Sequence, residues 1–124
     1  MQTKVAESEM IDAGIRTRIL AGLALGEREA HKISRRFGHW DKERNFPEVF
    51  CKIYQDAGIA LETITVGDGP SKRLDEFSRA EEALADIIIR IFDISQGMNL
   101  NVACCVIAKM DFNHAQSKLV KKEF

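Results

Sequence analysis

Apolar residues recur along this chain at intervals of three and four positions, the period of an α-helix. The clearest case begins with EEALADIIIRIFD, residues 81–93, which contains four carboxylates in a run of thirteen residues. At about 100° per residue, one broad apolar face collects Leu84, Ile87, Ile88, Ile91, Ile94 and Ser95. Glu82, Asp86 and Asp93 form a narrow stripe opposite it. The pattern predicts a core helix with one polar edge, and Asp93 is expected at the solvated end of that edge.

Turn and capping residues divide the chain into four expected helices, at about 8–37, 46–66, 74–96 and 100–118. Asn45 is expected to cap the second helix, and Asn99 the fourth. Gly97 is expected to end the third, whereas Gly22 and Gly26 could kink or interrupt the first. Residues 66–73, VGDGPSKR, are expected to form a plain loop. No segment shows a sustained period of two, so the predicted fold class is all-α.

The second helix is expected to align one apolar stripe, formed by Phe50, Ile53, Ala57, Leu61 and Ile64. The third is apolar over more than one face, because Ala85, Ile89 and Phe92 lie well outside the Leu84 stripe. A helix that is apolar most of the way round is buried on several sides. Four helices cannot supply that cover alone, so we expect a four-helix bundle that is completed by dimerisation, giving a homodimer or a higher oligomer.

Length and charge narrow the function classes. The chain has 124 residues and is expected to form a single domain, 1–124, with frayed tails at about 1–7 and 118–124. A net charge of −1 and a pI near 6.3 give no reason to expect binding to DNA or to an anionic membrane. No apolar run approaches the roughly 18 residues of a membrane span. The expected location is therefore the cytoplasm.

The chain has three cysteines, of which two are adjacent. Cys51, Cys104 and Cys105 show no metal-finger spacing, and each lies in an apolar helical context. They are expected to be buried, reduced and structural.

Several motifs together carry a family resemblance. The order RRFGHWDKERNFPEVF, a helix, GDGPSKR, and then EFSRAEEALADIIIRIFDISQGMNLNVACCVIAKMDFN resembles the MazG-like nucleoside triphosphate pyrophosphohydrolases, within them the short phage-type and environmental members. The likeness covers roughly residues 33–113. It implies an all-α MazG-like fold, an obligate oligomer whose smallest unit is a dimer, and Mg²⁺-dependent hydrolysis of nucleotides between the α and β phosphates, which releases diphosphate.

The resemblance also implies where a metal would bind. In the family, a Glu-x-x-Glu pair on one helix and a Glu-x-x-Asp pair on the next hold the Mg²⁺, since positions three apart share a helix face. The first pair falls on Asp56 and Ile59, and the second on Ala83 and Asp86. Two of the four ligands are therefore replaced. Glu82, four residues before Asp86, could form an irregular pair with it, so any Mg²⁺ site is expected to be weak and to use Asp56, Asp86 and Glu82.

Each residue also has a structural interpretation. Asp56 could be a boundary residue paired with a Lys or an Arg, and Asp86 could pair with Arg90 four residues on. By resemblance, Lys109 and Asn113 match positions close to the nucleotide phosphates. The usual basic residue and proline that follow are here Gln116 and Ser117. Trp40 could stack on a base or seal its loop against the bundle.

Three functions stay open at this point. The first is a pyrophosphohydrolase of weakened activity. The second is a catalytically silent member that still binds a nucleotide or another small ligand, and the third is a helical dimer that binds another protein. Nucleotide binding rests wholly on the resemblance, because the chain has neither a P-loop nor a dinucleotide glycine fingerprint.

Overall fold

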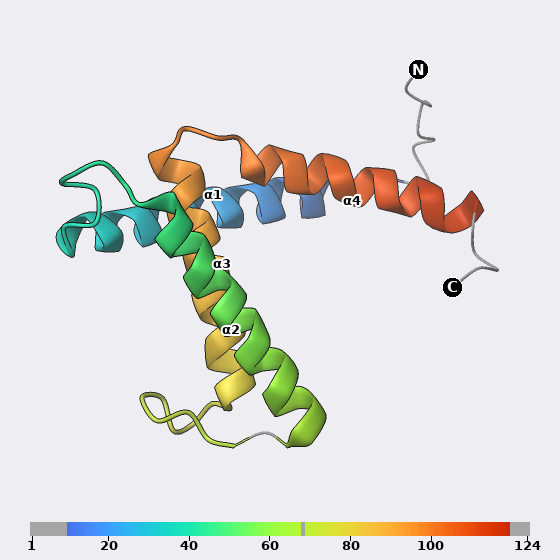
Figure 1. The fold of residues 1–124 in the computed structure, drawn as a ribbon. Helices are drawn as coiled ribbons and strands as arrows, with labels where there is room; N and C mark the ends of the chain where they lie inside the picture. The colour runs from blue at the N-terminus through green and yellow to red at the C-terminus, as the bar shows by residue number, and fades with distance from the viewer. Residues whose placement is uncertain (1–9, 68, 120–124) are drawn as a thin grey trace. The chain divides into compact units, whose positions relative to one another are not determined.

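The computed structural model describes residues 10–67 and 69–119, and this part of the chain is all-helical, as the sequence predicts. It contains four helices, drawn in Figure 1: α1 (Ala13–Arg36), α2 (Phe46–Val66), α3 (Arg79–Gly97) and α4 (Val102–Leu119). No strand occurs among the described residues, where a single isolated bridge joins Pro70 and Ser78. Within the same residues, no single helix is long and apolar enough to cross a membrane.

The chain divides into two compact units, Gly26–Asn99 and the pair of segments Met1–Leu25 and Leu100–Phe124. The first unit is built on a hairpin in which α2 and α3 lie side by side and run in opposite directions (Figure 1). In the second unit, Asp111 on α4 holds the start of α1. Its carboxylate accepts a hydrogen bond from the Ile11 amide at 2.9 Å and forms an ion pair with Arg16 at 2.7 Å.

Capping residues explain where α2 and α3 begin. The Asn45 side chain accepts a hydrogen bond from the Glu48 amide, so the prediction for this cap is confirmed. The expected start of the third helix near residue 74 is wrong. Ser78 and Glu81 form a reciprocal capping box, in which each side chain accepts from the other's backbone amide, and α3 therefore begins at Arg79.

Two other boundaries differ from expectation. Asn99 has a φ of +53° and its amide bonds to the Gln96 carbonyl, so it closes the end of α3 and does not cap α4. Helix α1 runs unbroken through Gly22 and Gly26, and α4 continues through Lys118 and Leu119, beyond the expected start of the tail. The other expected tail residues, 1–7 and 120–124, lie outside the described residues.

The buried face of the hairpin includes only part of the apolar stripes that the sequence suggests. The buried side chains are mostly small or polar, with Val49 and Ile94 as the larger apolar ones; they are Val49, Ala60 and Thr63 on α2 and Ala80, Ala83, Asp93, Ile94 and Ser95 on α3. In contrast, Leu61 and Ile64 are 65% and 64% exposed, and Leu84 and Ile88 are 45% and 50% exposed. Within the single chain, Ile94 and Ser95 are the buried members of the Leu84 stripe, and cover of the exposed members by a second copy stays a prediction.

The cysteines and Asp93 also depart from expectation. All three cysteines, Cys51, Cys104 and Cys105, are exposed in the single chain and not buried. Asp93, expected in solvent, is only 4% exposed. A buried carboxylate needs partners because an ion without them is costly to remove from water, and the structure supplies several of them.

Candidate functional site

A pocket of about 340 Å³ opens beside the α2–α3 contact, within the unit Gly26–Asn99. Its lining includes all four positions of the implied metal-ligand pairs, Asp56, Ile59, Ala83 and Asp86, together with Glu82. Two helices place them there because positions three apart share a face on each helix. The same pocket is lined by four basic side chains, which belong to Lys72, Arg73, Arg79 and Arg90.

Asp56 is joined to Arg90 across the hairpin. An Arg90 Nη1 donates to Asp56 Oδ2, and the two side chains are 29% and 14% exposed. This agrees with the interpretation of Asp56 as a boundary residue paired with a Lys or an Arg. The expected pairing of Arg90 with Asp86 is wrong, since the ion pair of Arg90 crosses to the neighbouring helix.

Asp86 is a half-buried carboxylate in the same wall. Burial raises its pKa above the usual value, and the negative charges of Asp56 and Glu82 act in the same direction. Arg90 and Arg73 oppose this shift through their positive charge. The environment of Asp86 therefore disfavours its charged form, on balance, in the absence of a further cation.

Glu82 is held by the loop that precedes α3. The Ser71 hydroxyl donates to Glu82 Oε2, and the Ser71 oxygen accepts from the amides of Arg73 and Leu74 at 3.2 and 3.0 Å. Ser71 is itself 3% exposed. Residues 71–73, part of the expected plain loop, are therefore folded around a buried hydroxyl, and Lys72 and Arg73 line the pocket.

The donor set does not fit the magnesium site that the resemblance implies. Mg²⁺ prefers oxygen ligands in an octahedral arrangement, but Ile59 and Ala83 supply none at two of the four positions. Of the remaining carboxylates, Asp56 is engaged by Arg90 and Glu82 by Ser71. Within residues 10–67 and 69–119, no three His, Cys, Asp or Glu side chains are grouped so that they could hold a metal ion.

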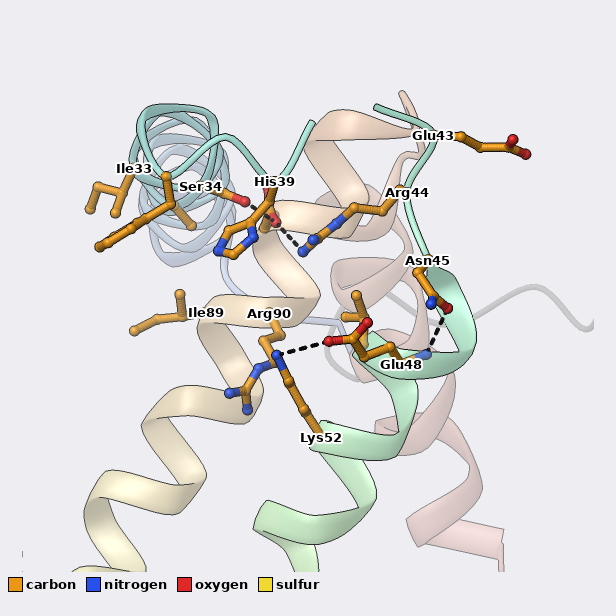
Figure 2. A pocket seen from close by; sticks show the side chains of 14 residues that line it. Ile33, Ser34, His39, Glu43, Arg44, Asn45, Glu48, Lys52, Ile89 and Arg90 are labelled. Carbon is orange, nitrogen blue, oxygen red and sulfur yellow. Dashed lines mark hydrogen bonds and ion pairs between the residues drawn. The ribbon is translucent and has the colours of Figure 1, made fainter. Parts of the chain in front are cut away.

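A second cavity, of about 400 Å³, is shown in Figure 2. Arg90 lines both pockets. Apolar side chains in its wall include Ile33, Val49 and Ile89, and polar ones include His39 and Lys52. Lys52 forms an ion pair with Glu48 at 3.5 Å. The cavity therefore combines an apolar wall with a few polar groups, as small-molecule sites commonly do.

Asp93 also lines this cavity and accepts from four donors. Its Oδ1 bonds to His31 Nδ1 at 2.9 Å and accepts from Trp40 Nε1 at 2.8 Å. Its Oδ2 accepts from Ser34 Oγ at 2.7 Å and from Arg44 Nη2 at 3.3 Å. These contacts join the end of α1, the following loop and α3, so Asp93 is the polar centre of this unit.

Trp40 is committed to the same cluster. Its ring meets His31 edge-on, with centroids 5.1 Å apart, and Arg44 lies 5.3 Å from the ring centroid. A Cβ added at Gly97 would overlap the ring, so the close approach of α3 requires glycine there. These contacts agree with the interpretation that Trp40 seals its loop against the helices.

Lys109 and Asn113, the two expected phosphate-proximal residues, belong to the other unit, on α4. The Lys109 ammonium lies 4.6 Å from the centroid of the Phe112 ring. Both Lys109 and Asn113 line a shallow groove with Val102, Cys105, Val106 and Met110. Their role in binding phosphate stays a prediction.

Sequence reasoning missed the basic residues of the pocket. The sequence predicts Lys72 and Arg73 in a plain loop and Arg90 as a partner of Asp86. One signal was available, because SKR and Arg79 flank EEALAD, and Arg90 follows Asp86 by one helical turn. A comparison of the chain with protein-family models, curated proteins and solved structures found no match.

Proposed function

We propose that this protein has a MazG-like nucleotide pyrophosphohydrolase fold and binds the phosphates of a nucleotide in the pocket between α2 and α3. The observation that carries the proposal is the lining of that pocket, which contains all four positions of the family's ligand pairs. The resemblance of QDAGIALE and EEALAD to the family motifs assigns these positions. Their convergence in one pocket supports the proposal.

Hydrolysis is proposed to be weak or absent. Family chemistry needs several carboxylates to hold hard cations beside the scissile phosphate. Here Ile59 and Ala83 provide no oxygen, and Arg90 occupies Asp56. Binding of the phosphates is better supported than turnover, because four basic side chains line the same pocket.

The neighbouring cavity is the proposed place for the nucleoside. Arg90 lines both spaces, so phosphates bound at Arg90 would leave the sugar and base next to the 400 Å³ cavity. Its apolar wall is suited to a base, and His39 and Asn45 provide hydrogen-bonding groups at its edge. This arrangement assigns no ligand contact to Trp40, which keeps its structural role against the helices.

A homodimer is part of the proposal. The face of α2 that carries Phe50, Tyr54, Leu61 and Ile64 repeats at intervals of four, seven and three residues, and all four side chains are exposed in the single chain. Exposed apolar stripes of this kind are typical of helix-pairing surfaces. A second copy that covers these stripes would bury them in a bundle. Sedimentation at micromolar concentration should give at least twice the 14.0 kDa mass of one chain.

The test of the function is a titration with a panel of nucleoside triphosphates and Mg²⁺, followed by phosphate analysis. Saturable binding with slow or no release of diphosphate is the expected result. Rapid diphosphate release would contradict the weak-hydrolysis part of the proposal. Absence of binding to every nucleotide in the panel would overturn the proposal as a whole.

The exposed stripe on α2 also supports a second candidate, a non-catalytic helical dimer that binds another protein or a small ligand. The two proposals differ in the partner of the α2 stripe, which is a second copy in the first proposal and another protein in the second. If the stripe is buried between two copies, polar substitution at Leu61 and Ile64 should produce monomers. If it binds another protein, the same substitutions should leave the mass of the assembly unchanged, and no nucleotide should bind.

A further inference from the structure

The charge of the α2–α3 pocket is opposite to that of a carboxylate metal site. Four carboxylates at the family positions would carry −4 and would need cations before a phosphate could approach. In this chain the lining carries Lys72, Arg73, Arg79 and Arg90 against Asp56, Glu82 and Asp86, which is four positive and three negative groups. The pocket is therefore weakly positive without any metal.

Arg90 lies where the metal-ligand positions converge. Its guanidinium is paired with Asp56, the one carboxylate retained from the first ligand pair, and its charge acts on Asp86, the one retained from the second. An arginine has a fixed positive charge and five N–H donors in a planar fork, so one contact to a carboxylate leaves donors for another anion. The pairing with Asp56 also fixes the side chain, which reduces the entropy lost when a ligand binds.

We propose that Arg90, together with Lys72 and Arg73, takes the place of the metal ion, so that the pocket binds a di- or triphosphate group directly and without Mg²⁺. This inference rests on the proposed function for the identity of the ligand as a nucleotide. What it adds is that basic side chains of the protein, in place of a metal ion, supply the positive charge that binds the phosphates. Arginine and phosphate form short bidentate hydrogen bonds, and the loop held by Ser71 brings two further cations to the same anion.

The experiment is a calorimetric titration of the full-length protein with inorganic tripolyphosphate and, separately, with a nucleoside triphosphate, each in EDTA and in Mg²⁺. Saturable binding of tripolyphosphate in EDTA is expected, and Mg²⁺ should not tighten it. Arg90→Gln should weaken that binding about tenfold or more, the size expected for loss of a charge-assisted contact. Arg18→Gln, the same charge change on the exposed face of α1, should change it less than twofold.

A second variant keeps the test valid if Arg90→Gln fails to fold. Lys72→Gln combined with Arg73→Gln changes exposed side chains of the loop and leaves the Asp56–Arg90 pair in place. It should also weaken tripolyphosphate binding about tenfold. Arg90→Lys, which keeps the charge and loses the fork, should give an intermediate loss.

The outcomes separate the two proposals. Binding of either ligand only when Mg²⁺ is present would overturn the direct-binding inference and leave nucleotide binding intact. Binding of tripolyphosphate in EDTA without binding of any nucleoside triphosphate would sustain the inference and overturn the proposed function. No binding in either buffer, or equal binding by wild type and the pocket variants, would overturn the inference.

Discussion

Asp93→Asn is the substitution that most sharply tests the polar centre of the unit Gly26–Asn99. The carboxylate receives two donors on each oxygen, from His31 and Trp40 on one and from Ser34 and Arg44 on the other. An asparagine has almost the same shape but offers a single acceptor oxygen, and its amide nitrogen is itself a donor. Two of the four donors would then face another donor in a buried site.

The size of the effect follows from burial. The Asp93 side chain is 5% exposed and that of Arg44 is 15% exposed, so neither group is readily compensated by water. Leaving a buried donor without an acceptor costs about 1–3 kcal/mol, and breaking a buried ion pair by removing one partner costs about 3–5 kcal/mol. These contributions overlap, so we expect a loss of about 3–5 kcal/mol. Small domains are stable by only about 5–15 kcal/mol.

Urea denaturation followed by far-ultraviolet circular dichroism measures this loss directly as a lower midpoint with an unchanged slope. Trp40 is the single tryptophan of the chain, so its fluorescence reports on the same cluster without interference. Ser34→Ala removes one donor and keeps the carboxylate, and we expect it to cost about 1 kcal/mol. A loss below about 1 kcal/mol for Asp93→Asn, with native tryptophan emission, would refute the reasoning.

Three further predictions concern other parts of the chain. Gly97→Ala should destabilise the protein by about 1–3 kcal/mol because the new Cβ overlaps the Trp40 ring. Gly58→Ala lies in mid-helix with open space around the new Cβ and should stabilise the protein by about 0.5–1 kcal/mol. The urea midpoints of the two variants measure this contrast. Because the pKa of Asp86 is raised, the folded state binds a proton there more tightly than the unfolded state, and the charged form at pH 7 is destabilising. Asp86→Asn should therefore raise the melting temperature at pH 7. In wild type, protonation of Asp86 adds stability as the pH falls toward the ordinary carboxyl pKa, and the variant should lose this pH dependence. The pKa of Asp111 is lowered, chiefly by its hydrogen bond from Arg16. Its charge therefore stabilises the fold above a pH of about 3.9, and this stabilisation is lost on further acidification. In a pH series of melting curves, Asp111→Asn should lose less stability at acidic pH than the wild type does.

The sequence was sufficient for the secondary structure wherever local chemistry decides it. The helix at 46–66 was placed correctly because Asn45 and Gly67 mark its ends by capping. The third helix begins five residues later than the predicted residue 74, because the capping box of Ser78 and Glu81 sets its start at Arg79. The role of Asn99 was misassigned, since an asparagine can either cap a helix or adopt the left-handed conformation, and only the backbone distinguishes them.

Burial could not be predicted from helical periodicity in this chain. Leu61 and Leu84 look like core residues, but α2 and α3 pack through small residues such as Ala60 and Ala83, and the larger side chains face outward. Asp93 continues the polar stripe of Glu82 and Asp86, yet its partners come from His31, Ser34, Trp40 and Arg44, which are between 49 and 62 positions away in sequence. Contacts at that separation leave no signal in a periodic pattern. The same limit hid the pairing of Asp56 with Arg90.

The most direct test of the central claim is to restore the two missing carboxylates. Ile59→Glu combined with Ala83→Glu would place four carboxylates around one pocket, three residues apart on each helix. Ala83 is 5% exposed, and the new side chain must reach into the pocket beside Asp56 and Asp86. Mutual repulsion should therefore lower the melting temperature in chelator. Mg²⁺ that binds only the folded state should raise it again.

The measurement is the shift in melting temperature between EDTA and millimolar Mg²⁺ for wild type, the restored variant and a matched control. The control, Gln55→Glu with Gln96→Glu, adds the same charge at exposed polar positions on the same helices, outside the lining of the pocket and outside the apolar stripes. The account predicts a rise of several degrees on adding Mg²⁺ to the restored variant alone. Equal shifts in the restored and control variants, or no shift in either, would contradict the claim that these four positions form a degenerate MazG-like metal site.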